Sequence, residues 1–341
     1  MTLPNQMRAL VQLHDGYANT QTGPNVDDLA PFVALRDIPV PTPGPGQAVI
    51  KVQLAAVNPS DIHFIKGEYG QPRVNGTPAG FEAVGEVVAG DTPLVGQRVS
   101  FFASASGTWA EYAMTDISGL VPCRPDLSPV DAAGQLVNPL TAIAMFDIVQ
   151  QSGADSFVLN AAGSQLGKLL IALGRDHKIA PIAVVRRPEQ ADALRTLGAA
   201  EVIVTGEGDP MDQARAAFKN HKPRILLDAV ADQFTADLFF AMPNGASWIN
   251  YGKLSTDAPK LAQMGQLIFQ GKQIEGFWLT RWMKEVDPAR IPQAFATIQE
   301  RFVTADWVTD VAGIVPLSEA MTKLPQVLAQ PDGKAFIDPT A

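Results

Sequence analysis

From residue 156 to residue 279 the chain alternates short apolar segments with amphipathic, helix-like ones. Helix-like segments such as QLGKLLIALGRDH and PMDQARAAFKN separate the apolar ones, which are SFVLN, IAPIAVV, EVIVT, RILLDAV, ASWINYG and QIEGFWL. A strand that is apolar on both faces has to be covered on both faces, and helices between consecutive strands supply that cover. The pattern therefore predicts an α/β fold with a doubly wound parallel sheet of the Rossmann type.

The first third of the chain predicts a second, β-rich domain. Short segments rich in β-branched and aromatic residues alternate there with Gly/Pro clusters such as PVPTPGPGQ. These segments cover residues 48–57, 85–90, 97–102, 108–114 and 119–123. Their clustering predicts a folded, partly open barrel.

The C-terminal part predicts a helix over 288–303 and then a β-α-β stretch made of GIVPL, EAMTKLPQVLAQ and KAFI. These last strands have no partners nearby in the sequence, so we expect them to return to the N-terminal β domain. The chain of 341 residues is also longer than the roughly 250–300 residues at which a single core stops growing. We predict a β-rich domain in two parts, residues 1–127 and 285–341, with the doubly wound α/β domain between them over 128–284.

Composition excludes several classes of protein. The net charge of −9 and the pI near 5.0 argue against a nucleic-acid binder, which needs a basic face. No apolar run approaches the roughly 18 residues that a membrane span needs, so no membrane partner is expected. The only cysteine, Cys123, cannot form an internal disulfide, and the N-terminus does not resemble a signal peptide. These features predict a cytoplasmic protein.

The strongest local motif is VLNAAGSQLGKLLIALG at 158–174, where an apolar strand, a small-residue turn and a helix follow one another. Small residues let the backbone approach a pyrophosphate, whose charge the helix N-terminus stabilises. Ala161 replaces the first glycine of the usual dinucleotide motif, and Gly167 permits close helix–strand packing. A tight β-α turn without a ligand is the alternative. The predicted cofactor contacts in this turn are Ala162, Gly163, Ser164, Gln165 and Leu166.

Two arginines end the second strand of this domain, about 20 residues after the glycine turn. NAD-binding sites place an acidic residue there, which binds the ribose 2′-hydroxyl. Arg186 and Arg187 instead suit a 2′-phosphate, so we predict NADPH as the cofactor. A solvated pair at the start of a helix, before Pro188, is the alternative.

Motifs along nearly the whole chain resemble the medium-chain dehydrogenase/reductase superfamily. Within it they look closest to the mitochondrial-type trans-2-enoyl-thioester reductases, with quinone oxidoreductases next. The matching motifs are AAVNPSDIHFIKGEYG (55–70), GFEAVGEVVAGD (80–91), GTWAEYA (107–113), VNPLTAIAMF (137–146), VVRRPEQADALRTLGA (184–199), WINYGKLS (248–255) and GKQIEGFWLTRWM (271–283). The resemblance implies a GroES-like catalytic domain, an inserted Rossmann domain and a homodimer.

The resemblance also bears on metal. Zinc alcohol dehydrogenases of the superfamily often carry a ligand histidine in a Gly-His-Glu motif, which reads Gly80–Phe81–Glu82 here. Cys123 has no cysteine partner, and His14, His63, His177 and His221 lack ligand spacing. We therefore predict no metal, and without a Lewis acid the chemistry shifts toward hydride addition to an activated C=C bond.

Such an addition places negative charge on the carbonyl oxygen of the substrate, so the protein has to supply a hydrogen-bond donor or a proton. Tyr69, in GEYG, matches the position where the thioester reductases carry a tyrosine. We predict it as the catalytic residue. The alternative is a loop aromatic that packs on Pro72.

The resemblance suggests further contacts, each with a structural alternative. Asn58, Trp278 and Trp282 are predicted to line the substrate pocket, although the NPSD turn around Ser60 and Asp61 can be purely structural and the tryptophans can belong to a dimer core. Thr141 is predicted to face the nicotinamide, and the alternative is a structural position in the interior of a helix. The other predicted cofactor contacts are Tyr251 and Gly252 after a Rossmann strand, Phe277, Trp278 and Leu279 in a late strand, and Lys334.

The predicted function is NADPH-dependent reduction of a trans-2-enoyl thioester carried by CoA or acyl carrier protein. A quinone or alkenal/enone reductase is the alternative enzyme, and a non-catalytic nucleotide-binding protein is the alternative of another class. An acidic carrier protein would need a basic patch on this acidic chain, and the candidates are Lys66, Arg73, Arg281 and Lys284.

Overall fold

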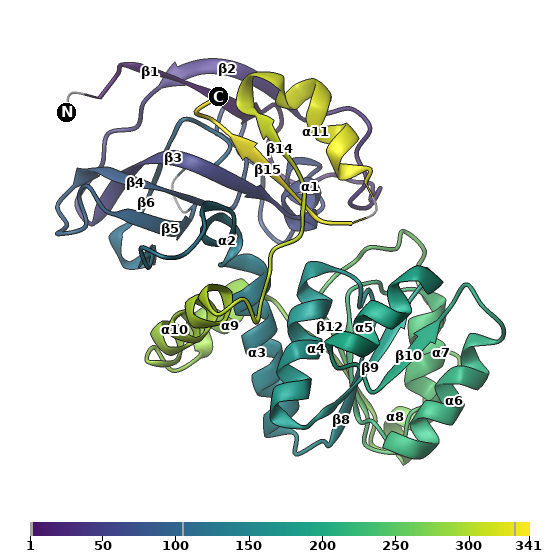
Figure 1. Ribbon diagram of the computed structural model, residues 1–341. Helices are drawn as coiled ribbons and strands as arrows, with labels where there is room; N and C mark the ends of the chain where they lie inside the picture. Colours follow the sequence, from purple (N-terminus) through teal and green to yellow (C-terminus); the bar gives the residue numbers. More distant parts are fainter. Residues whose placement is uncertain (1–2, 104–105, 331) are drawn as a thin grey trace. The chain divides into compact units, whose positions relative to one another are not determined.

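The computed structural model describes residues 3–103, 106–330 and 332–341 (Figure 1). The chain divides into two compact units. Unit 1 consists of Met1–Asn138 and Phe295–Ala341, and unit 2 consists of Pro139–Ala294. Each unit has its own sheet and its own buried core.

Unit 2 is built on a six-stranded parallel sheet with the strand order β10-β9-β8-β11-β12-β13. The chain starts in the middle of the sheet, winds outward to β10 and then returns to wind outward on the other side. This is the doubly wound topology, so the predicted Rossmann fold is confirmed. The strands are β8 (Ser156–Leu159), β9 (Ala180–Val185), β10 (Glu201–Val204), β11 (Ile225–Asp228), β12 (Ser247–Asn250) and β13 (Gln273–Gly276).

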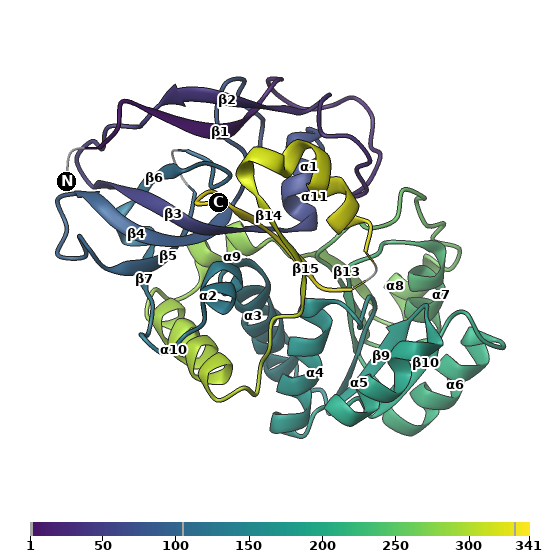
Figure 2. The ribbon, with the colours of Figure 1, turned by 45° about the horizontal axis from the view of Figure 1, so that its top comes forward.

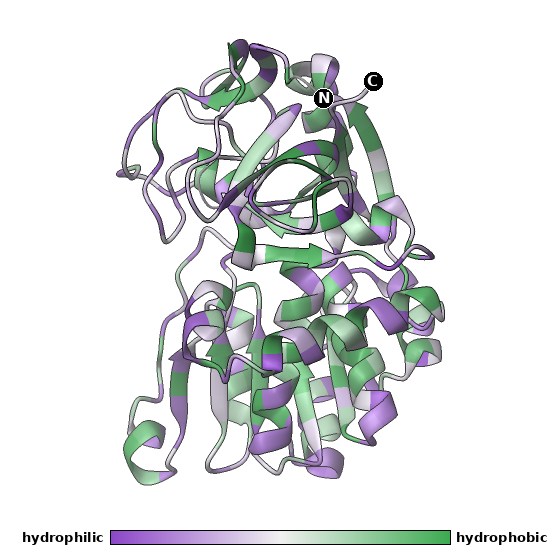
Figure 3. Cartoon of the chain, turned by 90° about the vertical axis from the view of Figure 1, so that its left-hand side faces the viewer, coloured by the Kyte–Doolittle hydropathy of each residue, from purple (hydrophilic) through white to green (hydrophobic). Residues whose placement is uncertain are grey.

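Helices connect these strands, and several begin at a polar residue that accepts a free amide N–H of the first turn, as Ser164, Asp209 and Asp232 do. Figure 3 shows hydrophobic residues along the strands, while the helices alternate hydrophobic and hydrophilic residues. The helices are α3 (Val137–Gln151), α4 (Gln165–His177), α5 (Ala191–Leu197), α6 (Pro210–His221), α7 (Gln233–Ala241), α8 (Gly265–Phe269) and α9 (Leu279–Glu285).

Two elements of unit 2 differ from the prediction. The segment KLAQMGQLIFQGK (260–272) is helix-like in sequence but forms only the short α8. Ile268 and Phe269 of α8 are 76% and 85% exposed, so its apolar residues gain little from burial within the unit. The last strand ends at Gly276. The prediction that residues 277–279 lie in that strand was therefore wrong: Phe277 and Trp278 follow it and Leu279 begins α9.

Unit 1 contains a seven-stranded sheet with the order β14-β15-β3-β4-β5-β7, in which β6 also pairs with β3, and a two-stranded sheet of β1 and β2 (Figure 2). The last strand pairs with β3 in antiparallel register, Ala335 opposite Val57, so the predicted return of the C-terminal strands is confirmed. The strands are β1 (Gln6–Gln12), β2 (Val33–Pro39), β3 (Gln47–Val57), β4 (Glu82–Gly90), β5 (Arg98–Phe102), β6 (Tyr112–Asp116), β7 (Leu120–Pro122), β14 (Val311–Pro316) and β15 (Lys334–Asp338).

The helices of unit 1 are α1 (Pro59–Ile65), α2 (Pro129–Gly134), α10 (Arg290–Val303), which begins in unit 2, and α11 (Ala320–Leu328). Within the described part of the chain, single 3₁₀ turns occur at Ile117–Gly119 and Leu317–Glu319 in unit 1 and at Pro188–Gln190 in unit 2. No helix among the described residues is long and apolar enough to cross a lipid bilayer.

The units change over at 138/139 and 294/295, whereas the sequence places the changes at 127/128 and 284/285. Helix α2 accounts for the first difference, because it packs against β3, β4 and β5. Arg290 of α10 accounts for the second. Its guanidinium donates to both carboxylate oxygens of Asp147 on α3, at 2.9 and 2.7 Å, which ties the start of α10 to unit 2.

Candidate functional site

The turn between β8 and α4 in unit 2 has the geometry of a dinucleotide-binding loop. Ser164 caps the helix by accepting the N–H of Gly167 at 3.1 Å. A Cβ atom on Gly167 would lie 2.5 Å from the carbonyl oxygen of Ala162, so only glycine permits this approach. The side chains of Ala162 and Leu166 are buried. These two residues therefore offer a ligand little beyond their backbone, while Gly163, Ser164 and Gln165 are more exposed.

Ala161 stands in the left-handed region with φ +47°, a conformation that favours glycine. The departure from the usual glycine motif thus sits at a position where the backbone is held in an unfavourable conformation. Neighbouring Gly163 lies directly under the side chain of Gln190, since a Cβ there would lie 2.4 Å from its Nε2. The sequence reading missed Gln190, which adds an amide group to the turn.

Arg186 and Arg187 directly follow β9, the strand beside β8. The two strands are parallel, with Leu159 opposite Ala183, so the arginines and the glycine turn stand at the same edge of the sheet. Arg186 is exposed and Arg187 is half-buried. The small-residue turn, the helix N-terminus and the two guanidinium groups fit a phosphorylated dinucleotide.

A buried aspartate joins the ends of three neighbouring strands at this edge. Asp228 ends β11, and one carboxylate oxygen accepts Asn160 Nδ2 after β8 and the N–H groups of the loop that follows β11. The other oxygen accepts Trp248 Nε1 at 2.7 Å and Asn250 Nδ2 at 2.9 Å from β12. The sequence reading missed this group, although an acidic residue at the end of the apolar run RILLD was a visible signal.

Tyr251 and Gly252 follow β12 as predicted for residues beyond a Rossmann strand. The Tyr251 hydroxyl is buried and has no hydrogen-bond partner among the described residues. Burial, and then the charge of Asp228, raise the pKa of this phenol, so it stays protonated. Gly252 lies against the backbone, because a Cβ there would be 2.7 Å from the carbonyl of Ala229.

The remaining predicted contacts of unit 2 lie on its helices and after its last strand. Thr141 is on α3 and only 7% exposed. Phe277 donates its N–H to the carbonyl of Asn250 at 2.8 Å, which fixes the chain just after β13. Trp278 precedes α9 and Trp282 lies within it, and both side chains are half-buried.

Tyr69 of unit 1 belongs to an aromatic cluster. Its ring centroid lies 5.1 Å from that of Phe81 and 6.5 Å from that of Phe64, which α1 supplies. Phe64 and Phe81 are themselves 5.0 Å apart. The phenol is half-buried, so the cluster fixes the ring while part of the side chain stays accessible.

Asn58 and Lys334 come together in a buried polar cluster with Glu82. Glu82 Oε1 accepts Asn58 Nδ2 at 2.8 Å and Lys334 Nζ at 3.1 Å, and Lys334 also donates to Asn58 Oδ1. Glu82 Oε2 accepts the N–H groups of Leu136 and Val137. Both side-chain ends of Asn58 are thus engaged, and Asn58 and Lys334 are 2% and 6% exposed, so neither is available to a ligand in this conformation.

Asp61 lies next to this cluster and is fully buried. It accepts the N–H of Asn58 at 2.7 Å, while its other oxygen has no partner among the described residues. Burial raises the pKa of this carboxyl to about 7, against the smaller lowering effects of the Asn58 hydrogen bonds and of Lys334. The charge of Glu82 adds to the rise.

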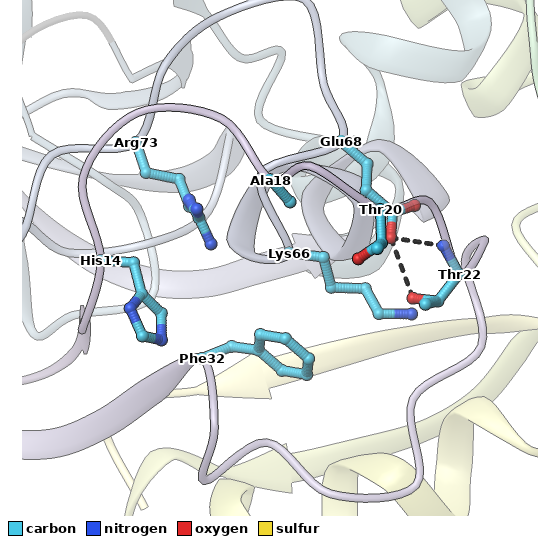
Figure 4. Close-up of a pocket in the computed structure, with 8 residues that line it drawn as sticks. All are labelled: His14, Ala18, Thr20, Thr22, Phe32, Lys66, Glu68 and Arg73. Carbon is cyan, nitrogen blue, oxygen red and sulfur yellow. Dashed lines mark hydrogen bonds between the residues drawn. The ribbon is translucent and has the colours of Figure 1, made fainter.

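The four predicted basic-patch residues do not form one surface patch. Lys66 and Arg73 are 6% and 8% exposed and line a pocket of unit 1, of about 340 Å³ (Figure 4). Arg281 and Lys284 lie on the exposed side of α9 in unit 2. Lys66 and Arg73 point inward because they anchor surrounding loops through backbone carbonyls.

Two family models match the chain. The model described as "Alcohol dehydrogenase GroES-like domain" matches residues 44–125, and the model described as "Zinc-binding dehydrogenase" matches residues 166–300. Together they cover more than half of the sequence. The first match lies in unit 1 and most of the second lies in unit 2.

Full-length relatives also align with the chain. The mitochondrial enoyl-[acyl-carrier-protein] reductase of Bos taurus is 28% identical over 331 residues, which are 94% of this chain and 85% of the relative. The same enzyme of Mus musculus is 30% identical over 310 residues, 86% of this chain and 78% of the relative. A crystal structure of a candidate NADPH:quinone reductase from Mesorhizobium loti is 46% identical, covers 99% of this chain and 100% of its own, and has a TM-score of 0.95.

The second family description implies zinc, and the residues of this chain do not fit it. Phe81 has no metal-ligating atom in its side chain, and the carboxylate of Glu82 accepts four hydrogen bonds from protein groups. The Cys123 thiol contacts Ser100 and Gln135, and burial raises its pKa. Across residues 3–103, 106–330 and 332–341, no three His, Cys, Asp or Glu side chains are grouped to hold a metal.

Proposed function

This chain belongs to the medium-chain dehydrogenase/reductase superfamily, and from that premise we propose that it is an NADPH-dependent oxidoreductase that reduces the C=C bond of a trans-2-enoyl thioester. The thioester carrier is CoA or acyl carrier protein. The observation that carries the proposal is the packing of Tyr69 against Phe81. Phe81 stands where the zinc enzymes of the superfamily carry a ligand histidine. Tyr69, whose ring packs against Phe81, carries a hydroxyl group that can donate a hydrogen bond.

The proposed cofactor is NADPH, which supplies the hydride when bound. Gly163, Ser164 and Gln165 are proposed to meet its pyrophosphate at the N-terminus of α4. Arg186 and Arg187 are proposed to hold the 2′-phosphate at the same sheet edge. Further proposed cofactor contacts are Thr141, Gly252 and the segment from Phe277 to Leu279. Lys334 is not among them, because it is buried and bonded to Asn58 and Glu82. The Tyr251 hydroxyl is buried inside unit 2.

The chain's own residues supply binding, orientation and a donor. As charge develops on the thioester oxygen, the Tyr69 hydroxyl is proposed to donate to it, and a neutral phenol can do so at neutral pH because its ordinary pKa is about 10. Phe64 and Phe81 hold the ring in place. Trp278 and Trp282 are proposed to line the acyl pocket.

A quinone reductase is the second candidate function, and one observation favours it. The solved structure that is 46% identical is described as a candidate NADPH:quinone reductase. A quinone also develops negative charge on an oxygen as it accepts hydride, so the same phenol would serve it. An alkenal or another enone would need the same group.

A substrate panel tests these proposals. Oxidation of NADPH is followed with crotonyl-CoA, a longer enoyl-CoA, a small quinone and a free alkenal under one set of conditions. The proposal predicts the highest kcat/KM for an enoyl thioester. A higher value for the quinone would support the second candidate, and binding of NADPH without turnover of any substrate would support a non-catalytic nucleotide-binding protein.

We also propose a homodimer in the cytoplasm. All four residues of the edge strand β13 are exposed, and the nearby α8 exposes Ile268 and Phe269. An exposed sheet edge beside apolar side chains is a surface that a second copy can cover. Sedimentation equilibrium of the protein and of Phe269→Ser tests the dimer: the variant should shift toward monomer.

A further inference from the structure

Unit 1 contains a pocket that the proposed reaction does not use (Figure 4). It lies between the loop that follows β1 and the segment that follows α1, and its volume is about 340 Å³. The side chains that matter here are His14, Thr22, Phe32, Lys66, Glu68 and Arg73. Three of these six carry nitrogen bases or cations on a chain whose net charge is −9.

Lys66 is buried, and no carboxylate among the described residues pairs with it directly. Its ammonium group donates to the carbonyl oxygens of Gly23 and Asn25, both at 2.7 Å, which leaves one of its three N–H groups. Burial lowers the pKa of this lysine, and the charges of Glu68 and Asp27 only partly oppose that effect. The positive charge is therefore poorly compensated, although buried charges in proteins are usually paired.

Arg73 is the second buried cation, and its acceptors are again neutral. The guanidinium donates to the carbonyls of Gly16 at 3.0 Å, Ile65 at 3.3 Å and Asp15 at 3.5 Å, which leaves two of its five N–H groups. Gly67 makes room for it, because a Cβ there would lie 2.5 Å from Arg73 Cζ. The site is thus built around the guanidinium.

Among the described residues that line the pocket, Glu68 is the only carboxylate, and other groups already bind it. Glu68 Oε1 accepts the N–H and the hydroxyl of Thr22, and Oε2 accepts the N–H of Gly23 and contacts His63 Nδ1 at 3.2 Å. Although burial acts to raise its pKa, these hydrogen bonds lower it below the usual value, so Glu68 stays ionised. Two cations and one carboxylate leave one positive charge in the lining.

The Phe32 ring is the aromatic part of the pocket lining. The Phe32 ring lies with its centroid 6.0 Å from Lys66 Nζ, and His14 is fixed beside it by a 2.8 Å contact between Nε2 and the carbonyl of Pro31. Small-molecule sites have volumes of about 300–1,000 Å³, so this pocket suits a ligand at the small end of that range. It combines donors for an anion with a surface for a planar group.

We propose that this pocket binds a small organic anion, with a phosphomonoester or carboxylate held by Lys66 and Arg73 and a planar apolar part against Phe32. The site lies wholly within unit 1 and goes beyond the proposed reductase function. The remaining N–H groups of the two cations supply the charge-assisted hydrogen bonds. Thr22 and Glu68 keep the pocket rim in place.

Phenyl phosphate is the probe, titrated calorimetrically into the full-length protein with benzoate and inorganic phosphate in parallel. The proposal predicts saturable one-site binding that is weakened about tenfold in Lys66→Met, or 1.4 kcal/mol. Phe32→Leu should weaken phenyl phosphate more than inorganic phosphate. The exposed Lys219→Met and the cofactor-site double variant Arg186→Ser/Arg187→Ser should bind as the unmodified protein does.

The matched variants keep the test decisive. Loss of binding in the Arg186→Ser/Arg187→Ser protein would assign the anion to the dinucleotide site and overturn the proposal, as would unchanged binding in both Lys66→Met and Phe32→Leu. Absence of saturable binding to all three anions would also overturn it. If Lys66→Met fails to fold by circular dichroism, His14→Gln and Phe32→Leu carry the test, and both should weaken the binding of phenyl phosphate.

Discussion

Lys334 Nζ lies 3.1 Å from Glu82 Oε1, although the two residues are 252 positions apart in the chain. Their side chains are 5% and 0% exposed. The pair joins β15, from the C-terminal part of unit 1, to β4, from its N-terminal part. Lys334 thereby binds the carboxylate of Gly80–Phe81–Glu82, the motif in which zinc alcohol dehydrogenases of the superfamily often carry a ligand histidine. The carboxylate of Glu82 is therefore the partner of Lys334 and not a free metal ligand.

Removing one partner of this pair should destabilise the protein strongly. Glu82→Gln keeps the side-chain shape but removes the charged carboxylate to which Lys334 donates. Breaking a buried pair in this way costs about 3–5 kcal/mol. Guanidinium unfolding of the variant should show a free energy of unfolding that is lower by about this amount.

The control is a double-mutant cycle with Lys334→Met. If the two residues are coupled, the double variant loses less stability than the sum of the two single losses. Additive losses would mean that Glu82 acts only through Asn58 and the amides of Leu136 and Val137.

Asp61 should make stability depend on pH. Its pKa is raised from 3.8 to about 7 in the folded protein, so between these values the folded state keeps a proton that the unfolded state has lost. Stability from this group is therefore greatest below pH 3.8 and is lost as pH rises toward about 7, by about 4 kcal/mol in all. Urea unfolding at several pH values should show this slope, which Asp61→Asn removes. Asp192→Asn, at a side chain that is 96% exposed, should leave it unchanged.

The parallel sheet and its doubly wound order could be predicted because apolar runs and intervening helices are local patterns. The return of the last strands to the N-terminal domain could also be predicted, since terminal strands without neighbours need a sheet to join, although their pairing with β3 comes only from the structure. The glycine turn and the position of Arg186 and Arg187 are local too. These features depend on residues that are close in sequence.

What sequence reasoning missed depends on contacts between distant segments. Asp228 is held by groups from β8 and β12, and nothing in RILLD says which groups those are. Lys66 and Arg73 look like surface cations in the sequence but turn inward to carbonyls of the loop after β1. Their burial cannot be read from charge alone.

Cofactor choice should depend on the two arginines after β9. We expect NADPH to bind at least tenfold more tightly than NADH, which is about 1.4 kcal/mol. Arg186→Ser/Arg187→Ser should remove most of that difference by weakening NADPH rather than by strengthening NADH. Fluorescence titration with both cofactors measures it. The exposed Arg215→Ser on α6 is the control, and equal affinities in the unmodified protein would refute the assignment.

Activity should not require zinc. The donor set around Phe81 and Cys123 does not fit the metal, and Glu82 is held by protein donors. Exhaustive chelation should leave kcat unchanged, and elemental analysis should find well under one zinc per chain. Stoichiometric zinc together with loss of activity on chelation, restored by added zinc, would contradict the prediction.

Tyr69→Phe should separate a hydrogen-bond donor from a packing residue. Phenylalanine keeps the ring contacts with Phe64 and Phe81 and removes only the hydroxyl. Loss of one preorganised donor to a developing oxyanion costs about 2.7–4 kcal/mol, so kcat should fall by about 10²–10³. Steady-state kinetics with the best substrate of the panel gives kcat, while NADPH affinity and the melting temperature should stay nearly the same.

Tyr17→Phe is the matched control, because that tyrosine is 59% exposed and lies outside the aromatic cluster. It should leave kcat unchanged. A fall of less than about threefold for Tyr69→Phe, well below the loss expected for an oxyanion donor, would make Tyr69 a packing residue. The donor would then have to be Thr141, a bound water or the nicotinamide ribose hydroxyl. Thr141→Val would distinguish the first of these, since it removes a hydroxyl from α3 and keeps the side-chain shape.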